Sequence, residues 1–252
     1  MKQRVVRILR RARIDPTRLT HGDGLSDDER NTVKFVQDYT MTSPERIAAL
    51  CDGVRYLVDN SIKGSIVECG VWRGGSMMAV ARTLLELDET SRDLYLYDTY
   101  AGMTEPTDRD EDDKGRTAAR GMTRFGRDDA GNSKWCNASL EDVTANLART
   151  GYPSARCHFL VGPVESTIPA TMPDSIALLR LDTDWYESTR HELEHLFPLL
   201  VPGGVLVLDD YGHWQGARRA VDEYFAARDY SPLLNRIDYT GRIAVVPAGG
   251  GQ

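Results

Sequence analysis

The sequence predicts an α/β protein built on a mostly parallel β-sheet with helices on both faces. Three observations predict this fold. Short apolar, β-prone runs alternate along the chain with segments of helical periodicity. The runs are almost continuously apolar, which is typical of strands buried on both faces of a sheet. The first five runs end at glycines or acidic residues, and the carboxyl ends of such strands are where open α/β sheets bind ligands.

The expected strands and helices follow one another in regular alternation. Strands are expected at 66–69, 94–97, 157–161, 177–182, 205–210 and 243–246. Helices are expected at 77–87, 140–147, 187–200 and 217–228, with residues 201–204 ending the third of them. We find no internal repeat, and one large domain accommodates these elements.

The N-terminal quarter of the chain is expected to form a helical cap on the α/β domain. Residues 1–20 predict a basic helix, and residues 21–32 predict a polar connector. Ser43 is a good N-cap for a helix with proline at its first position, and apolar residues then recur at helical period. We therefore divide the chain into a cap over 1–63 and an α/β domain over 64–252.

Composition and charge exclude several classes of protein. The chain has 252 residues, with 31 lysines and arginines against 38 aspartates and glutamates, so its formal net charge is −7. An acidic chain lacks the basic surface that nucleic acids require, and no run approaches the ~18 apolar residues of a membrane-spanning helix. The N-terminus has no signal-peptide core, and the cysteines form no CxxC pair. We expect a cytoplasmic protein without nucleic-acid or membrane partners.

The first motif is a glycine-rich turn after the first strand, Glu68-Cys69-Gly70-Val71-Trp72-Arg73-Gly74-Gly75. Glycine allows the backbone to approach a ligand closely, and the GxxxGG spacing differs from the GxGxxG of nicotinamide-binding proteins. Glu68 would repel a pyrophosphate but favour the amine and sulfonium of S-adenosylmethionine. Asp98, at the end of the second strand, can accept hydrogen bonds from a ribose diol. Together they predict nucleoside binding, with a tight structural turn and a helix cap as the alternatives.

Acidic residues follow the fourth and fifth strands. Asp182 and Asp184 share a face if the strand continues past 181, and Asp209 and Asp210 end the next strand. Converging carboxylates repel one another, and a hard divalent cation such as magnesium relieves that repulsion. Surface acids or helix caps are the alternative. His213 follows the acidic pair, as a group that orients a substrate, a base, or an ordinary loop histidine.

Aromatic residues lie near the same strand ends in the sequence. Their side chains could stack on a sugar or an aromatic ring, or they could simply pack. They are Trp135, Trp185, Tyr186 and Trp214. A long polar segment, residues 104–135, carries a run of acids over 108–113. Loops of this length are usually functional or mobile.

Four segments together resemble the macrocin and mycinamicin (TylF/MycF) O-methyltransferases. They are residues 67–75, 97–103, 179–184 and the pair of short runs 202–204 and 209–211. The resemblance implies a Rossmann-like class I methyltransferase fold with a seven-stranded, mostly parallel sheet, and it makes 64–252 the methyltransferase domain with a lid at 104–135. It also implies methylation of sugar hydroxyls on antibiotics and related natural products, with magnesium, in a homo-oligomer.

The resemblance also implies roles for individual residues. The cofactor-binding residues would be Thr40, Met41, Glu68, Gly70, Val71, Trp72, Arg73, Gly74, Ser76, Asp98, Thr99, Gly162, Glu165 and Asp182. The metal ligands would be Asp184, Asp209 and Asp210, with Asp182 as general base. Trp185, Tyr211 and His213 would contact the acceptor. Catechol methyltransferases carry a lysine where this chain has Trp185, which disfavours a catechol-type lysine base.

The sequence therefore favours a magnesium-dependent O-methyltransferase that acts on a sugar hydroxyl of a glycosylated natural product. One alternative is methylation of a phenol or polyketide hydroxyl, and another is a nucleoside-binding protein without turnover. Three aspartates distinguish an enzyme from a protein that only binds nucleosides, since a pure binder has no use for Asp182, Asp209 and Asp210 together. A nicotinamide oxidoreductase is a distant third, because GxGxxG is absent.

Overall fold

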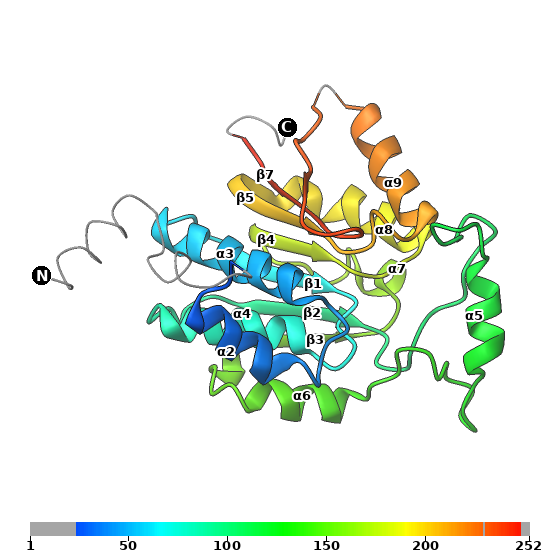
Figure 1. The fold of residues 1–252 in the computed structure, drawn as a ribbon, viewed down its shortest axis with the longest axis horizontal. Coiled ribbons are helices and arrows are strands. Elements are labelled where there is room, and N and C mark those ends of the chain that lie inside the picture. The colour runs from blue at the N-terminus through cyan, green and yellow to red at the C-terminus, as the bar shows by residue number, and fades with distance from the viewer. Residues whose placement is uncertain (1–23, 229, 248–252) are drawn as a thin grey trace, which may run out of the picture.

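A seven-stranded sheet forms the centre of the protein (Figure 1). The computed structural model describes residues 24–228 and 230–247. The strands lie in the order β3-β2-β1-β4-β5-β7-β6. They are β1 Ser65–Cys69, β2 Leu94–Asp98, β3 Cys157–Val161, β4 Ile176–Leu181, β5 Leu200–Leu208, β6 Asn235–Arg236 and β7 Arg242–Val245. The first five are parallel, and β7 is antiparallel to both of its neighbours, so the predicted sheet is confirmed.

Helices cover both faces of the sheet, as predicted. One face is covered by α2 Asp27–Val36, α3 Pro44–Asp59, α4 Gly75–Glu86 and α6 Leu140–Ala148 (Figure 1). The other is covered by α7 Val164–Thr167, α8 Tyr186–His195 and α9 Gln215–Ala226. None of the described helices is long and apolar enough to cross a membrane.

Two apolar cores, one on each face, explain why the strands are almost continuously apolar. Successive side chains of a strand point to opposite faces. In β1, Ile66 packs into the core beneath α3 and α4, and Val67 packs into the core beneath α8 and α9. In β2, Leu96 and Tyr97 divide in the same way. Every inner strand position therefore loses its contact with water, which favours apolar residues throughout.

The expected polar connector over 21–32 is wrong in its second half. Residues from Asp27 onward form α2, which Ser26 caps. The Ser26 hydroxyl accepts a hydrogen bond from the amide of Glu29, and the Glu29 carboxylate accepts one from the amide of Ser26. This capping box satisfies two amides that the helix leaves unpaired, and its spacing is visible in the sequence. The expected basic helix at 1–20 lies outside the described residues.

The expected helix over 187–200 is also too long. Helix α8 ends at His195, and a short 3₁₀ turn, Phe197–Leu199, leads directly into β5. Residues 201–204, which we expected to be only the helix stop, belong to that strand. Pairing with β4 begins at Leu200. Proline and glycine disfavour a strand, so residues 202–204 are extended because the sheet holds them there.

The segment 104–135 is ordered around a short helix, α5 Ala118–Phe125, which stands away from the sheet (Figure 1). Its acids have structural partners. Asp110 is fully buried and accepts hydrogen bonds from the amides of Thr107 and Tyr186, and the second of these caps α8. Asp112 accepts bonds from the amides of Lys114 and Arg116. Asp110 therefore fastens the segment to α8, and Asp112 holds a turn within the segment itself.

Removal of a buried side chain from the core tests the packing of α4 on the sheet. Leu84 is fully buried, so we expect Leu84→Ala to lower the free energy of unfolding by about 2–5 kcal/mol. Leu233 is 79% exposed, and Leu233→Ala should change it by less than about 0.5 kcal/mol. Urea denaturation of both variants measures the difference. Equal losses in the two would contradict this assignment of the core.

Candidate functional site

The carboxyl ends of the parallel strands open into two adjoining cavities. The larger has a volume of about 350 Å³, which falls within the range of small-molecule sites. The smaller, of about 60 Å³, lies beside it. Five residues line both, namely Gly70, Asp98, Gly102, Met103 and Asp182. The glycine turn and the acidic residues that the sequence placed at separate strand ends thus share one bilobed space.

Gly70 lets the end of β1 approach the end of β4. Its φ is +82°, and a Cβ atom there would overlap the backbone carbonyl of Asp182. A larger residue at this position would push the two strand ends apart, so this glycine is required by the fold as well as by a ligand. Gly74, with a φ of +87°, then caps α4.

Asp98 shapes the glycine turn through its carboxylate. One oxygen accepts hydrogen bonds from the amides of Val71 at 2.6 Å and Trp72 at 3.0 Å, and the other accepts one from the amide of Tyr100 at 2.8 Å. The sequence assigned Asp98 to a ribose diol. The structure adds this second role, because the same carboxylate that faces both cavities also fixes the backbone between them.

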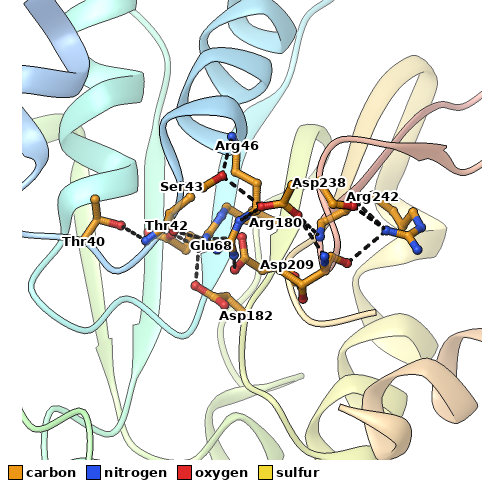
Figure 2. Close-up of polar contacts among 12 residues, drawn as sticks. Thr40, Thr42, Ser43, Arg46, Glu68, Arg180, Asp182, Asp209, Asp238 and Arg242 are labelled. Atoms are coloured by element: carbon orange, nitrogen blue, oxygen red, sulfur yellow. Dashed lines mark hydrogen bonds and ion pairs between the residues drawn. The ribbon is translucent and has the colours of Figure 1, made fainter. Parts of the chain in front are cut away.

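Arg180 in β4 is the most connected side chain of the site, and sequence reasoning missed it. It is 3% exposed. One terminal nitrogen lies 2.5 Å from Glu68 and 2.7 Å from Asp182. The other donates to Asp209 at 2.6 Å and to the Thr42 hydroxyl at 3.0 Å. Figure 2 shows these carboxylates gathered around one guanidinium. A charged residue inside the apolar run 177–181 was the signal in the sequence.

Glu68 faces Arg180, and it does not line either cavity. Its side chain is 1% exposed. Burial raises the pKa of Glu68 to about 7, although the charge of Arg180 opposes that shift. The sequence expected Glu68 to meet the amine or sulfonium of the cofactor. In the structure its contact is the internal Arg180, which accounts for an acid inside the strand.

Arg46 brings the cap into the site. It extends from α3, contacts the second carboxylate oxygen of Asp209, and lies 3.0 Å from Asp238 (Figure 2). Asp238 also accepts a hydrogen bond from the Ser43 hydroxyl at 2.9 Å. We call Ser43, Arg46, Asp209 and Asp238 the clasp, because together they join the start of α3 to the end of β5 and to the β6–β7 turn.

Three carboxylates lie close enough to share one cation. Oxygens of Asp182, Asp209 and Asp210 all lie within 4.8 Å of one another. Asp184 is outside this group and pairs with Asp210, and burial raises its pKa to about 7. Burial also raises the pKa values of Asp182 and Asp210 well above the usual range. These hard oxygen donors suit Mg²⁺, and Arg180 and Arg46 already offset part of their charge.

The other expected site residues divide by position. Residues that line the larger cavity are Thr40, Met41, Val71, Trp72, Ser76, Asp184, Asp209, Asp210 and His213. Thr99, Gly162 and Glu165 line the smaller one. Besides Glu68, four expected residues line neither, namely Arg73, Gly74, Trp185 and Tyr211. Arg73 pairs with Asp142, and the Tyr211 hydroxyl donates to Asp222, so both have structural partners.

Three tryptophans pack together beside the larger cavity. Trp185 lies 5.0 Å from Trp214 and 5.7 Å from Trp135, measured between ring centroids. Trp185 is buried, and its two neighbours line the cavity. Trp185 was expected to contact the acceptor. In the structure it supports the two rings that reach the cavity, and it joins segment 104–135 to α8 and α9.

Glu192 of α8 anchors the loop over residues 182–184. It is fully buried, and its carboxylate accepts a hydrogen bond from the Thr183 hydroxyl at 2.9 Å. Thr183 lies between Asp182 and Asp184, and Asp184 has a φ of +69°. Burial raises the pKa of Glu192 well above its usual range. A side chain of α8 thus anchors the loop that carries two carboxylates of the site.

Comparison with known proteins gives consistent matches. Residues 24–244 match the family of macrocin O-methyltransferases (TylF). The chain is 32% identical, over 81% of its length and 74% of the relative, to 8-demethyl-8-(2,3-dimethoxy-α-L-rhamnosyl)-tetracenomycin-C 4′-O-methyltransferase of Streptomyces olivaceus. It is 30% identical to mycinamicin III 3″-O-methyltransferase of Micromonospora griseorubida, over 81% of this chain and 76% of the relative.

Solved structures share the fold. The O-methyltransferase NovP superposes with a TM-score of 0.71 at 29% identity, covering 83% of this chain and 82% of its own. The calicheamicin methyltransferase CalS11 superposes with a TM-score of 0.59 at 17% identity, over 87% of this chain and 91% of its own. The second likeness concerns the fold alone. The class I methyltransferase fold predicted from the sequence is confirmed.

The role of Asp98 can be tested by graded substitution. We expect Asp98→Ala to weaken binding of S-adenosylhomocysteine about ten-fold or more, because three amides of the turn lose a charged acceptor. Asp98→Asn keeps one acceptor oxygen, so its affinity for S-adenosylhomocysteine should lie between those of Asp98→Ala and the wild type. Isothermal titration calorimetry measures both affinities. An unchanged affinity in Asp98→Ala would refute this role.

The raised pKa of Glu192 predicts how stability depends on pH. The folded protein keeps the proton, whereas the unfolded chain releases it above about pH 4.3. Relative to Glu192→Gln, the wild type should therefore lose stability as the pH rises from 5 to 8, by at most about 1.4 kcal/mol per pH unit. Urea denaturation at each pH provides the measurement. Glu187→Gln, at an exposed position, serves as the control. If the difference in unfolding free energy between the wild type and Glu192→Gln is as independent of pH as that for Glu187→Gln, the pKa of Glu192 is not raised.

Proposed function

The chain belongs to the macrocin O-methyltransferase family and is an S-adenosylmethionine-dependent O-methyltransferase, and from this premise we propose its acceptor, its cation and the roles of its residues. We propose that it methylates a sugar hydroxyl of a glycosylated small molecule with the help of Mg²⁺. The observation that carries the proposal is the single bilobed cavity into which both the glycine turn and the three carboxylates open. Because the family consists of O-methyltransferases, we no longer keep the alternative of a nucleoside-binding protein without turnover.

The cofactor would occupy the turn and the smaller cavity. Asp98 reaches the space between the two lobes, where a ribose diol would find an acceptor. Gly162 and Glu165, after β3, line the smaller lobe next to it. This arrangement would direct the methyl group toward the larger lobe and the carboxylates. The acceptor follows from the relatives, since the name of the tetracenomycin relative specifies a rhamnosyl derivative.

The acidic cluster would hold the cation and receive the proton. Asp182, Asp209 and Asp210 are the proposed ligands in place of the set with Asp184, because their oxygens converge. Bound Mg²⁺ would polarise the acceptor hydroxyl and lower its pKa. Asp182 lines both lobes, so it is the group best placed to take the hydroxyl proton as the new O–C bond forms and the S–C bond breaks. Arg180 fixes one of its oxygens.

The walls of the larger lobe would position the acceptor. Trp135, Trp214 and His213 line it, and aromatic rings suit the apolar face of a sugar. We keep a homo-oligomer in a cytoplasmic setting as predictions from the resemblance. A phenol or polyketide hydroxyl is the acceptor class that a screen of substrates must separate from sugars.

Asp210 offers a cleaner test of the cation site than Asp209, because loss of the Asp209 carboxylate would also remove an ion pair from each of two arginines, Arg46 and Arg180. We expect Asp210→Asn, or removal of divalent cations with EDTA, to lower methyl transfer at least about 100-fold, because the acceptor hydroxyl is no longer activated. Binding of S-adenosylhomocysteine should change less than about three-fold. Transfer of a radiolabelled methyl group to demethylated glycosides gives the rate.

The same substitution at an exposed position, Asp222→Asn, provides the control and should leave both quantities unchanged. Full activity in EDTA would refute the role of magnesium. Activity with free phenols but with no glycoside would refute the proposed acceptor class and leave the cofactor site intact.

A further inference from the structure

Both carboxylate oxygens of Asp209 are already engaged by arginines. Oδ1 accepts a hydrogen bond from Arg180 at 2.6 Å, and Oδ2 accepts one from Arg46. The side chain is only 6% exposed, so water compensates little of this charge. A cation that binds Asp209 must therefore share the carboxylate with a guanidinium that lies against it. Two cations that share one carboxylate repel each other.

The two arginines differ in how firmly they are held. Arg180 is 3% exposed and contacts Glu68, Asp182 and Asp209. Arg46 is 12% exposed and pairs with Asp209 and Asp238 alone. Arg46 can leave Asp209 and still keep Asp238 as an ion partner, whereas Arg180 cannot leave Asp209 without disturbing its contacts with Glu68 and Asp182. Arg46 is thus the arginine that can yield to a cation.

We propose that Arg46 is a positioning residue that competes with the divalent cation for Asp209, with Asp238 as the alternative partner that accepts its charge. The clasp in Figure 2 has the required geometry, since Arg46 lies between the two aspartates. This inference rests on the proposed cation site. It goes beyond that site by assigning a role in cation affinity to a residue of the cap.

The surroundings of Arg46 keep it within reach of both partners. A Cβ atom at Gly241 would lie 2.7 Å from Cδ of Arg46, so the glycine leaves room for the stem of the side chain. The Ser43 hydroxyl donates to Asp238 and ties that carboxylate to the first turn of α3. The cap residues before this turn, 39–42, line the larger cavity. Cation binding and the position of the cap are therefore coupled through Arg46.

Two substitutions that break the same ion pair should have opposite effects on cation binding. Arg46→Met removes the competing charge, so we expect Mn²⁺ and Mg²⁺ to bind about ten-fold more tightly. Asp238→Asn removes the alternative partner and leaves Arg46 to Asp209, so both ions should bind several-fold more weakly. Arg46→Lys retains the charge and should stay close to the wild type. Calorimetric titration of each full-length protein with the metal chloride measures these affinities.

Arg92→Met is the matched control, because Arg92 is a buried arginine that binds backbone carbonyls far from the cluster. It should leave cation affinity unchanged, whatever it does to stability. Binding of S-adenosylhomocysteine, measured in parallel, reports whether each variant retains a folded cofactor site.

The outcomes separate this inference from the proposed function. If the wild type binds the cation and Arg46→Met binds it equally or more weakly, the role of Arg46 is overturned and the magnesium site still stands. Asp238→Asn with unchanged or tighter binding also overturns it, even if Arg46→Met does not fold. The absence of binding in the wild type and in all variants overturns both. Binding that appears only in Arg46→Met supports the competition.

Discussion

A buried guanidinium is the interaction on which the rest of the site depends. Parallel strands bring their carboxyl ends to one edge, and in this chain those ends carry acids on β1, β4 and β5. Several buried carboxylates cannot all stay ionised in a low-dielectric interior without positive charge nearby. Arg180 places that charge between Glu68, Asp182 and Asp209. The acids can then be packed against the sheet instead of being exposed around it.

This arrangement also determines what remains for a ligand. Glu68 is paired with Arg180 and lines neither cavity. The acids that line the larger cavity are Asp98, Asp182, Asp184, Asp209 and Asp210. Asp98 fixes the backbone of the glycine turn on one side, and Glu192 fixes the loop of the carboxylates on the other. Transfer reactions require two reactants in fixed relative positions, and here both supports arise from elements that flank the same strand ends.

The cap and the segment 104–135 are part of the site as well as covers for it. Arg46 extends from α3 to Asp209, and Thr42 accepts a hydrogen bond from Arg180. Trp135 lines the cavity from the other side and packs against Trp185 and Trp214. The proposed division at residue 63 therefore does not separate function, since both sides of it supply cavity residues.

The amino-acid sequence alone predicts the alternation of strands and helices, the parallel sheet and the residues at its carboxyl edge, because burial on two faces and glycine-rich turns leave local signals in the chain. It also contained the capping box at Ser26, which was overlooked. The convergence of Asp182, Asp209 and Asp210 within 4.8 Å is visible only in three dimensions, and our proposed ligand set follows it. The tertiary structure alone revealed Arg46 and Arg180 as counter-ions. Arg46 lies 163 positions from Asp209 in the chain, and Arg180 lies 112 positions from Glu68, and no local pattern encodes contacts over such distances.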